Sequence, residues 1–171
     1  MAAVKTVYRS EHDSIGERSV PKDVYYGVQS LRAAENFHIT GLTMHPEIIN
    51  SIAEIKKASA ITNYEIGLLD KRVADAIVRA CDEIAAGKLH EAFIVDPIQG
   101  GAGTSLNMNA NEVIANRAIE LLGGEKGDYA LVNPNDHVNY GQSTNDVFPS
   151  AGKMAVLKLL IRAQIQLERL Y

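Results

Sequence analysis

The sequence predicts a mostly α-helical protein. Apolar residues recur with helical spacing over four segments, and capping residues, proline and glycine mark where these segments begin and end. The 171 residues are 46% hydrophobic and 22% charged, which is typical of a soluble globular domain with one core. Spacing, end signals and composition together favour folded helices over a disordered chain.

Charge and hydropathy exclude several kinds of partner. The net charge of −4 leaves no basic surface that could neutralise nucleic acid or an anionic membrane. No apolar run approaches the roughly 20 residues that span a bilayer, and residues 1–10 lack the apolar stretch of a secretory signal. The single cysteine, Cys81, falls on an apolar stripe, which indicates a core residue in a reducing compartment. We therefore expect a cytoplasmic protein.

The first helix is predicted to begin at Pro46. Residues 1–45 contain recurring glycine and proline and no sustained helical period, so an irregular N-terminal segment is expected there. Proline suits the first turn of a helix because it has no N–H to satisfy. The apolar face of this helix would be formed by Ile48, Ile52 and Ile55.

A second helix is predicted between Asp70, as its N-cap, and Gly87, as its stop signal. Its apolar stripe consists of Val73, Ile77, Cys81 and Ile84. A third helix is predicted over residues 105–122, where Gly123 and Gly124 end it. This helix is unusually rich in asparagine, which competes with the backbone for hydrogen bonds. A buried amide network or a polar site is expected to compensate for Asn107, Asn109, Asn111 and Asn116.

The last helix is predicted over residues 145–171 and carries two apolar stripes. One stripe consists of Val156, Leu160, Ala163, Leu167 and Leu170, and the other of Met154, Leu157, Ile161 and Ile165. A helix with one buried side would show a single stripe, so this helix is expected to lie between several neighbours in a bundle or an oligomer. Without those neighbours it would expose apolar surface. No glycine or proline ends it before Tyr171, and we expect the chain to be truncated there.

A glycine-rich loop over residues 96–105 leads into the third helix. Such loops let backbone N–H groups approach an anion, and the helix dipole favours negative charge at that point. The loop lacks the lysine and spacing of a P-loop and the strand-flanked GxGxxG of a dinucleotide site. A tight turn that needs small residues explains the glycines equally well, and both interpretations stay open on these residues alone.

A second polar cluster, residues 139–146, leads into the last helix. Hydroxyl and amide side chains crowd the helix start, where several could donate to one small anion. Simple N-capping is the alternative, although a cap needs only one such residue. Neither cluster contains the cysteine, histidine and carboxylate groups of a zinc site or the acidic loop of a calcium site, so no metal is expected. His137 lies near the cluster and is interpreted as structural.

At these residues the sequence resembles the aspartases of the fumarase/aspartase superfamily. GGAGTSLNMNANEV at residues 100–113 is similar to their first signature region, and QSTND at 142–146 is similar to their substrate-binding turn. The resemblance covers nearly all of the chain. Further matches are Gly16-Glu17-Arg18, Val20-Pro21, Tyr25-Tyr26-Gly27, Asn36-Phe37 and Asn133-Pro134-Asn135-Asp136-His137-Val138-Asn139.

Two differences favour aspartases over fumarases, which share much of this pattern. Fumarases usually have Gly-Ser-Gly-Thr-Gln where this chain has GAGTS at residues 101–105. They usually have Ser-Ser-Asn-Asp where this chain has STND at residues 143–146. The chain departs from its relatives at Tyr140-Gly141, where a basic residue or methionine followed by serine or cysteine is more common.

The resemblance implies an N-terminal lyase domain, residues 1–144, followed by the first part of a central long-helix bundle, residues 145–171. It implies a homotetramer in which three subunits share each active site. Thr104, Ser143 and Thr144 would hold the β-carboxylate of L-aspartate, and Asn145 would contact its amino group. The reaction would give fumarate and ammonia without a cofactor.

The catalytic base of the family, a serine on a mobile loop, has no matching motif before Tyr171, nor have the later lysine and histidine. The 171 residues alone are therefore expected to be inactive. Two alternatives stay open: a fumarase-type hydratase acting on malate and fumarate, and a non-catalytic helical scaffold. A scaffold would not need several donors directed at one anion, and the four predicted site residues argue against it.

Overall fold

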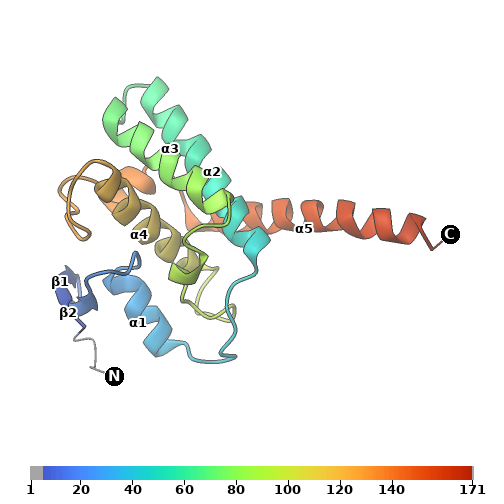
Figure 1. Ribbon diagram of the computed structural model, residues 1–171, viewed down its shortest axis with the longest axis horizontal. Helices are drawn as coiled ribbons and strands as arrows, with labels where there is room; N and C mark the ends of the chain where they lie inside the picture. The colour runs from blue at the N-terminus through green and yellow to red at the C-terminus, as the bar shows by residue number, and fades with distance from the viewer. Residues whose placement is uncertain (1–5, 171) are drawn as a thin grey trace.

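A two-stranded hairpin precedes the helices in the computed structural model, which describes residues 6–170 (Figure 1). Strands β1 (Tyr8–Asp13) and β2 (Gly16–Pro21) pair antiparallel, with Tyr8 opposite Pro21 and Asp13 opposite Gly16. Helix α1 (Val28–Asn36) follows. The prediction that residues 1–45 are irregular is therefore wrong over both strands and α1, while residues 1–5 lie outside the described residues.

The hairpin is held by a side chain that reaches across it. Arg9 donates from Nη1 to the carbonyl oxygens of Pro21 at 2.8 Å and Val24 at 2.9 Å, and from Nη2 to that of Tyr26 at 2.8 Å. These partners follow Arg9 by 12 to 17 residues. Secondary-structure propensities depend on neighbouring residues and give no information about a contact this distant in sequence. The sequence therefore does not predict the hairpin.

Helix α1 is capped by a residue from a distant helix. Its own N-cap, Gly27, has no side chain to accept a hydrogen bond. The carboxylate of Glu112 accepts instead from the backbone N–H groups of Gly27 at 2.9 Å, Gln29 at 2.9 Å and Ser30 at 3.0 Å. A carboxylate at this position satisfies free N–H groups and complements the helix dipole. The signal for α1 therefore lies more than eighty residues further along the chain.

Helices α2 (Pro46–Glu65) and α3 (Lys71–Ala85) form an antiparallel pair beside α4 (Figure 1). Both begin as predicted. Pro46 occupies the first turn of α2, and the Asp70 carboxylate accepts from the N–H of Arg72 at 2.8 Å at the start of α3. Gly87 follows α3 with a φ of +87°, a left-handed conformation that ends the helix at low cost.

Helix α4 (Thr104–Leu121) lies at the centre of the fold and contacts α1, α2, α3 and α5. All four predicted asparagines are buried in it. Asn109 accepts from the N–H of Ile94 and donates to the carbonyl of Ala92, both at 2.9 Å. Asn116 donates to the carbonyl of Tyr25 at 2.9 Å. The expected amide network therefore exists, and it ties loops to the central helix.

Helix α5 (Thr144–Glu168) follows two short helical turns, η1 (His90–Ala92) and η2 (Pro134–Val138). Its first half packs on the other helices through Val147, Ala151 and Ala155, and its second half projects away from them (Figure 1). The apolar stripes of this second half are exposed within the described chain, in Val156, Leu157, Leu160, Ile161, Ile165, Leu167 and Leu170. Between residues 6 and 170, no helix has the length and apolarity needed to cross a membrane.

Candidate carboxylate-binding site

The glycine-rich loop lies against the first turns of α5. Gly103 precedes α4 with a φ of +87°, and a Cβ atom at this position would overlap the ring of Phe148 on α5. A Cβ atom on Gly100 would likewise lie 2.6 Å from the ring of Phe37. The loop therefore needs glycine for close packing and for its backbone conformation, which supports the tight-turn interpretation. The same packing brings the start of α4 beside the start of α5.

Two anchors fix the glycine-rich loop. The Asp96 carboxylate accepts from the N–H groups of Thr40 at 2.6 Å and Ile98 at 2.8 Å. Burial acts to raise the pKa of Asp96, but these hydrogen bonds outweigh it and lower the pKa to about 2. At the other end of the loop, Gln99 accepts from the N–H of Leu106 at 2.7 Å. A free N–H in the first turn of α4 is thereby capped by the loop itself.

Thr144 is the predicted site residue with the clearest link between the two clusters. Its Oγ1 accepts a hydrogen bond of 3.1 Å from Nδ2 of Asn107, one turn into α4. Because a hydroxyl oxygen can accept while its hydrogen is donated elsewhere, Thr144 keeps one donor for a ligand. The expectation that the glycine-rich loop and the 142–146 turn lie close together is supported by this bond and by the Gly103 contact with Phe148.

The other three predicted residues lie at the two helix starts. Ser143 is the N-cap of α5, and its Oγ accepts from the N–H of Asn145 at 3.2 Å. Capping therefore accounts for this hydroxyl oxygen, as the simpler interpretation required. Thr104 begins α4 and is exposed, as is Asn145. Among residues 6–170, no hydrogen bond joins Thr104 to Ser143, Thr144 or Asn145, so only proximity of the two helix starts relates them.

A buried lysine lies behind the two clusters. Lys56 on α2 is fully buried, and its Nζ donates to Oδ1 of Asn139 at 2.7 Å. The same oxygen accepts from Nδ2 of Asn107 at 3.1 Å. Burial lowers the pKa of Lys56 to about 7. The site thus continues inward from Thr144 as a connected set of polar side chains.

Sequence reasoning missed Lys56 and Asn139 as parts of this cluster. A signal for Lys56 was present, since it lies four residues after Ile52 and four before Ala60, both buried. A lysine on the apolar stripe of a helix is unusual, because lysine is almost never fully buried without a partner. In the sequence Asn139 stands out only as part of a motif, because its contact with Lys56 spans 83 residues.

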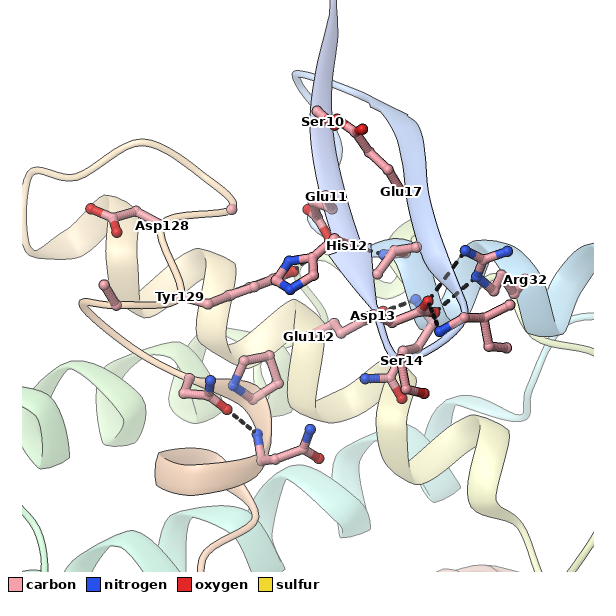
Figure 2. Close-up of a pocket in the computed structure, with 18 residues that line it drawn as sticks. Ser10, Glu11, His12, Asp13, Ser14, Glu17, Arg32, Glu112, Asp128 and Tyr129 are labelled. Atoms are coloured by element: carbon pink, nitrogen blue, oxygen red, sulfur yellow. Dashed lines mark hydrogen bonds and ion pairs between the residues drawn. The ribbon is translucent and has the colours of Figure 1, made fainter.

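A pocket of the described chain lies away from these clusters. It has a volume of about 1240 Å³ and opens between the hairpin and the loop that precedes η2 (Figure 2). Figure 2 shows Glu11, Asp13, Arg32, Glu112 and Tyr129 around it. Asp13 accepts from Nε of Arg32 at 2.8 Å, and the Tyr129 hydroxyl donates to Glu11 at 3.0 Å. These groups are paired within the fold, and none of the four predicted residues lines the pocket.

His137 has a structural contact, as predicted. Its Nδ1 accepts from the N–H of Asn133 at 2.9 Å, which closes the turn of η2. In the part of the chain that the structure describes, no three histidine, cysteine, aspartate or glutamate side chains are grouped so that they could hold a metal ion. Cys81 is a buried free thiol, and burial raises its pKa to about 12.

Comparison with known proteins identifies the family. The chain belongs to the Lyase family, whose model matches residues 16–170. Aspartate ammonia-lyases from a Bacillus species and from Bacillus subtilis are 60% and 59% identical to this chain, covering 92% and 90% of it. Fumarate hydratase class II from Halobacterium salinarum is 54% identical over 90% of the chain. The chain spans only 32% to 34% of the length of these relatives.

Solved structures agree with the fold. A crystal structure described as fumarate lyase:delta crystallin from Brucella melitensis matches with a TM-score of 0.94 and 51% identity, over 96% of this chain and 39% of that one. Class II fumarase from Schistosoma mansoni matches with a TM-score of 0.83 and 41% identity, over 88% of this chain and 32% of that one. The predicted resemblance and the mostly α fold class are therefore confirmed.

Proposed function

We propose that the complete protein is an aspartate ammonia-lyase that converts L-aspartate reversibly to fumarate and ammonia. The observation that carries the proposal is the 60% and 59% identity to two aspartate ammonia-lyases across a segment that contains both donor clusters. The hydrogen bond between Asn107 and Thr144 supports it, because it leaves a hydroxyl donor free at the place where the clusters meet.

In this proposal Thr104, Ser143 and Thr144 bind the β-carboxylate of L-aspartate, and Asn145 contacts its amino group. Neutral hydroxyl and amide donors suit a carboxylate because they hold it without a fixed counter-charge. A base removes a proton from Cβ, and the electron pair left behind spreads onto the β-carboxylate. The C–N bond then breaks as the C=C bond of fumarate forms, and ammonia leaves. Donors to the β-carboxylate strengthen as charge accumulates there, which is where catalysis needs them.

The rest of the expected assembly forms part of the same proposal. Residues 1–144 would be the lyase domain and residues 145–171 the first part of a bundle helix. Four copies would pack through the exposed face of α5 and share active sites between subunits. The base would come from a segment outside these residues, so the 171 residues alone would be inactive. A cytoplasmic location stays a prediction.

A fumarase-type hydratase is the second candidate, favoured by the 54% identity to fumarate hydratase class II of Halobacterium salinarum. The complete protein can be given L-aspartate or L-malate while fumarate is followed by its ultraviolet absorbance and ammonia by a coupled assay. With aspartate, we expect fumarate and an equimolar amount of ammonia. With malate, we expect no fumarate. Fumarate formed from malate and not from aspartate would establish the hydratase instead.

Replacement of Thr144 by alanine tests the role of the hydroxyl. Loss of one donor to a developing charge typically costs on the order of 3 kcal/mol, or roughly a hundredfold in rate. We expect this loss mainly in kcat, because the hydrogen bond strengthens in the transition state. Tyr140→Ala is the control and should cost far less. A raised KM with unchanged kcat would show that Thr144 binds substrate and transition state equally.

A further inference from the structure

Lys56, Asn139, Asn107 and Thr144 form a continuous hydrogen-bonded relay from α2 to the start of α5. Its three bonds measure 2.7, 3.1 and 3.1 Å. We propose that Lys56 is a positioning residue that sets the direction of this relay, so that the Thr144 hydroxyl donates its hydrogen outward to the substrate carboxylate. This inference rests on the proposed function, and it concerns a residue that touches no substrate.

The direction of the relay follows from the chemistry of lysine. While Lys56 carries its proton it can only donate, so Asn139 turns its oxygen, not its nitrogen, toward it. The Asn139 amide is also held from its other side, since its Nδ2 donates to the carbonyl of Gln142 at 3.2 Å. Asparagine orientations are assigned from such partners. The Gln142 carbonyl can only accept, so it fixes the same orientation of Asn139 when Lys56 is a neutral amine.

The same logic passes on to Thr144. Because the oxygen of Asn139 faces Asn107, Asn107 must turn its NH₂ group toward it, and that NH₂ group also reaches Oγ1 of Thr144. The threonine oxygen must therefore accept, and its hydrogen points away from the relay. If Asn107 were reversed, its carbonyl would accept the threonine hydrogen and the outward donor would be lost.

The surroundings of Lys56 give it no other charged partner. Within the described residues, no carboxylate lies within ion-pair distance of its Nζ, whereas its neighbour Lys57 pairs with Asp82 at 2.6 Å. The titratable group facing Lys56 from α3 is Cys81, whose pKa of about 12 keeps the thiol neutral. Oδ1 of Asn107 is also buried without a hydrogen-bond partner in the described chain. The lack of another charged partner for Lys56 and the unpaired Oδ1 of Asn107 among the described residues have one explanation. The relay holds the Asn107 amide in an orientation that leaves its oxygen without a hydrogen bond.

A double-mutant cycle on the complete protein tests the proposal. Lys56→Met removes the donor that directs the relay, Thr144→Val removes the outward hydroxyl, and Lys57→Met is the matched control. We expect Lys56→Met to lower kcat/KM for aspartate about tenfold, the value of one ordinary hydrogen bond. In the Thr144→Val background it should lower kcat/KM less than twofold further, because the group it acts through is already gone. Lys57→Met should leave kcat/KM unchanged.

Independent, multiplying effects of Lys56→Met and Thr144→Val would overturn the relay, since a merely structural lysine would damage both backgrounds equally. If Lys56→Met does not fold, Asn107→Asp replaces it in the cycle. Aspartate at this position offers only acceptors to Thr144, so it should reverse the hydroxyl and show the same loss and the same coupling. A Thr144→Val variant with unchanged kcat/KM would instead contradict the proposed function, which separates the two failures.

Discussion

Lys56 illustrates how one buried side chain couples the stability of this protein to pH. The pKa of its ammonium group falls from 10.5 to about 7 on folding. Between these values the unfolded chain holds a proton that the folded chain has lost, so the free energy of unfolding rises with pH. Cys81 acts in the opposite direction above pH 9, because its pKa rises from 9.0 to about 12. Between pH 7 and 9 the contribution of Lys56 is therefore larger than that of Cys81.

We predict that the free energy of unfolding of the original chain rises relative to that of Lys56→Met between pH 7 and 9. One proton corresponds to about 1.4 kcal/mol per pH unit. Urea unfolding at pH 7, 8 and 9 measures how steeply the free energy of unfolding rises with pH in both proteins. Lys57→Met is the control and should show the same rise as the original chain. A slope that survives in Lys56→Met would assign the pH dependence to another group.

At the scale of secondary-structure elements, the glycine-rich loop depends on Gly103. Both Gly103 and Gly87 have a φ of +87°, but a Cβ on Gly87 would meet no atom within 4 Å. Gly87→Ala therefore measures conformational strain alone, about 1 to 2 kcal/mol. Gly103→Ala adds a clash with Phe148, so we predict a larger loss of unfolding free energy and a loss of activity in the complete protein. Equal losses for the two variants would show that the loop can move away from α5 freely.

The start of α1 depends on Glu112 in the same way. Glutamine in its place would turn an NH₂ group toward backbone N–H donors, and each hydrogen bond to a charged group contributes about 1.5 to 3 kcal/mol. We predict that Glu112→Gln lowers the free energy of unfolding by about 3 kcal/mol. Glu125→Gln is the control, because the Glu125 side chain is 80% exposed and its pair with Lys22 is a surface ion pair worth less than about 1 kcal/mol. Similar losses would contradict the capping role.

For the whole molecule, the exposed apolar face of α5 predicts association with further copies of the chain. Leu160 and Ile161 are 59% and 61% exposed, and contiguous apolar surface of this kind marks an interaction site. The paired change of Leu160 and Ile161 to glutamate should shift the protein toward monomers in sedimentation velocity. Ile15→Glu, at an exposed apolar position on the hairpin, should leave the assembly unchanged. A protein that is monomeric at high concentration before any substitution would contradict the prediction.

The sequence by itself determined the helices from α2 onward and the family. Pro46, Asp70 and Gly123 act within a few residues of the ends they mark, so local chemistry is enough to locate α2, α3 and α4. The family motifs are likewise read residue by residue along the chain. The four predicted substrate-binding residues were identified from these motifs, and their roles remain predictions that substitution must test.

Only the tertiary structure decided the hairpin, α1 and the interior of the site. Glu112 caps α1 from 85 residues away, and Lys56 meets Asn139 across 83 residues. No pattern of neighbouring residues contains such contacts, because they exist only once α1 has packed on α4 and α2 has packed on η2. Thr144 could be recognised from its motif, whereas the direction in which its hydroxyl donates depends on a lysine that folding brings to it.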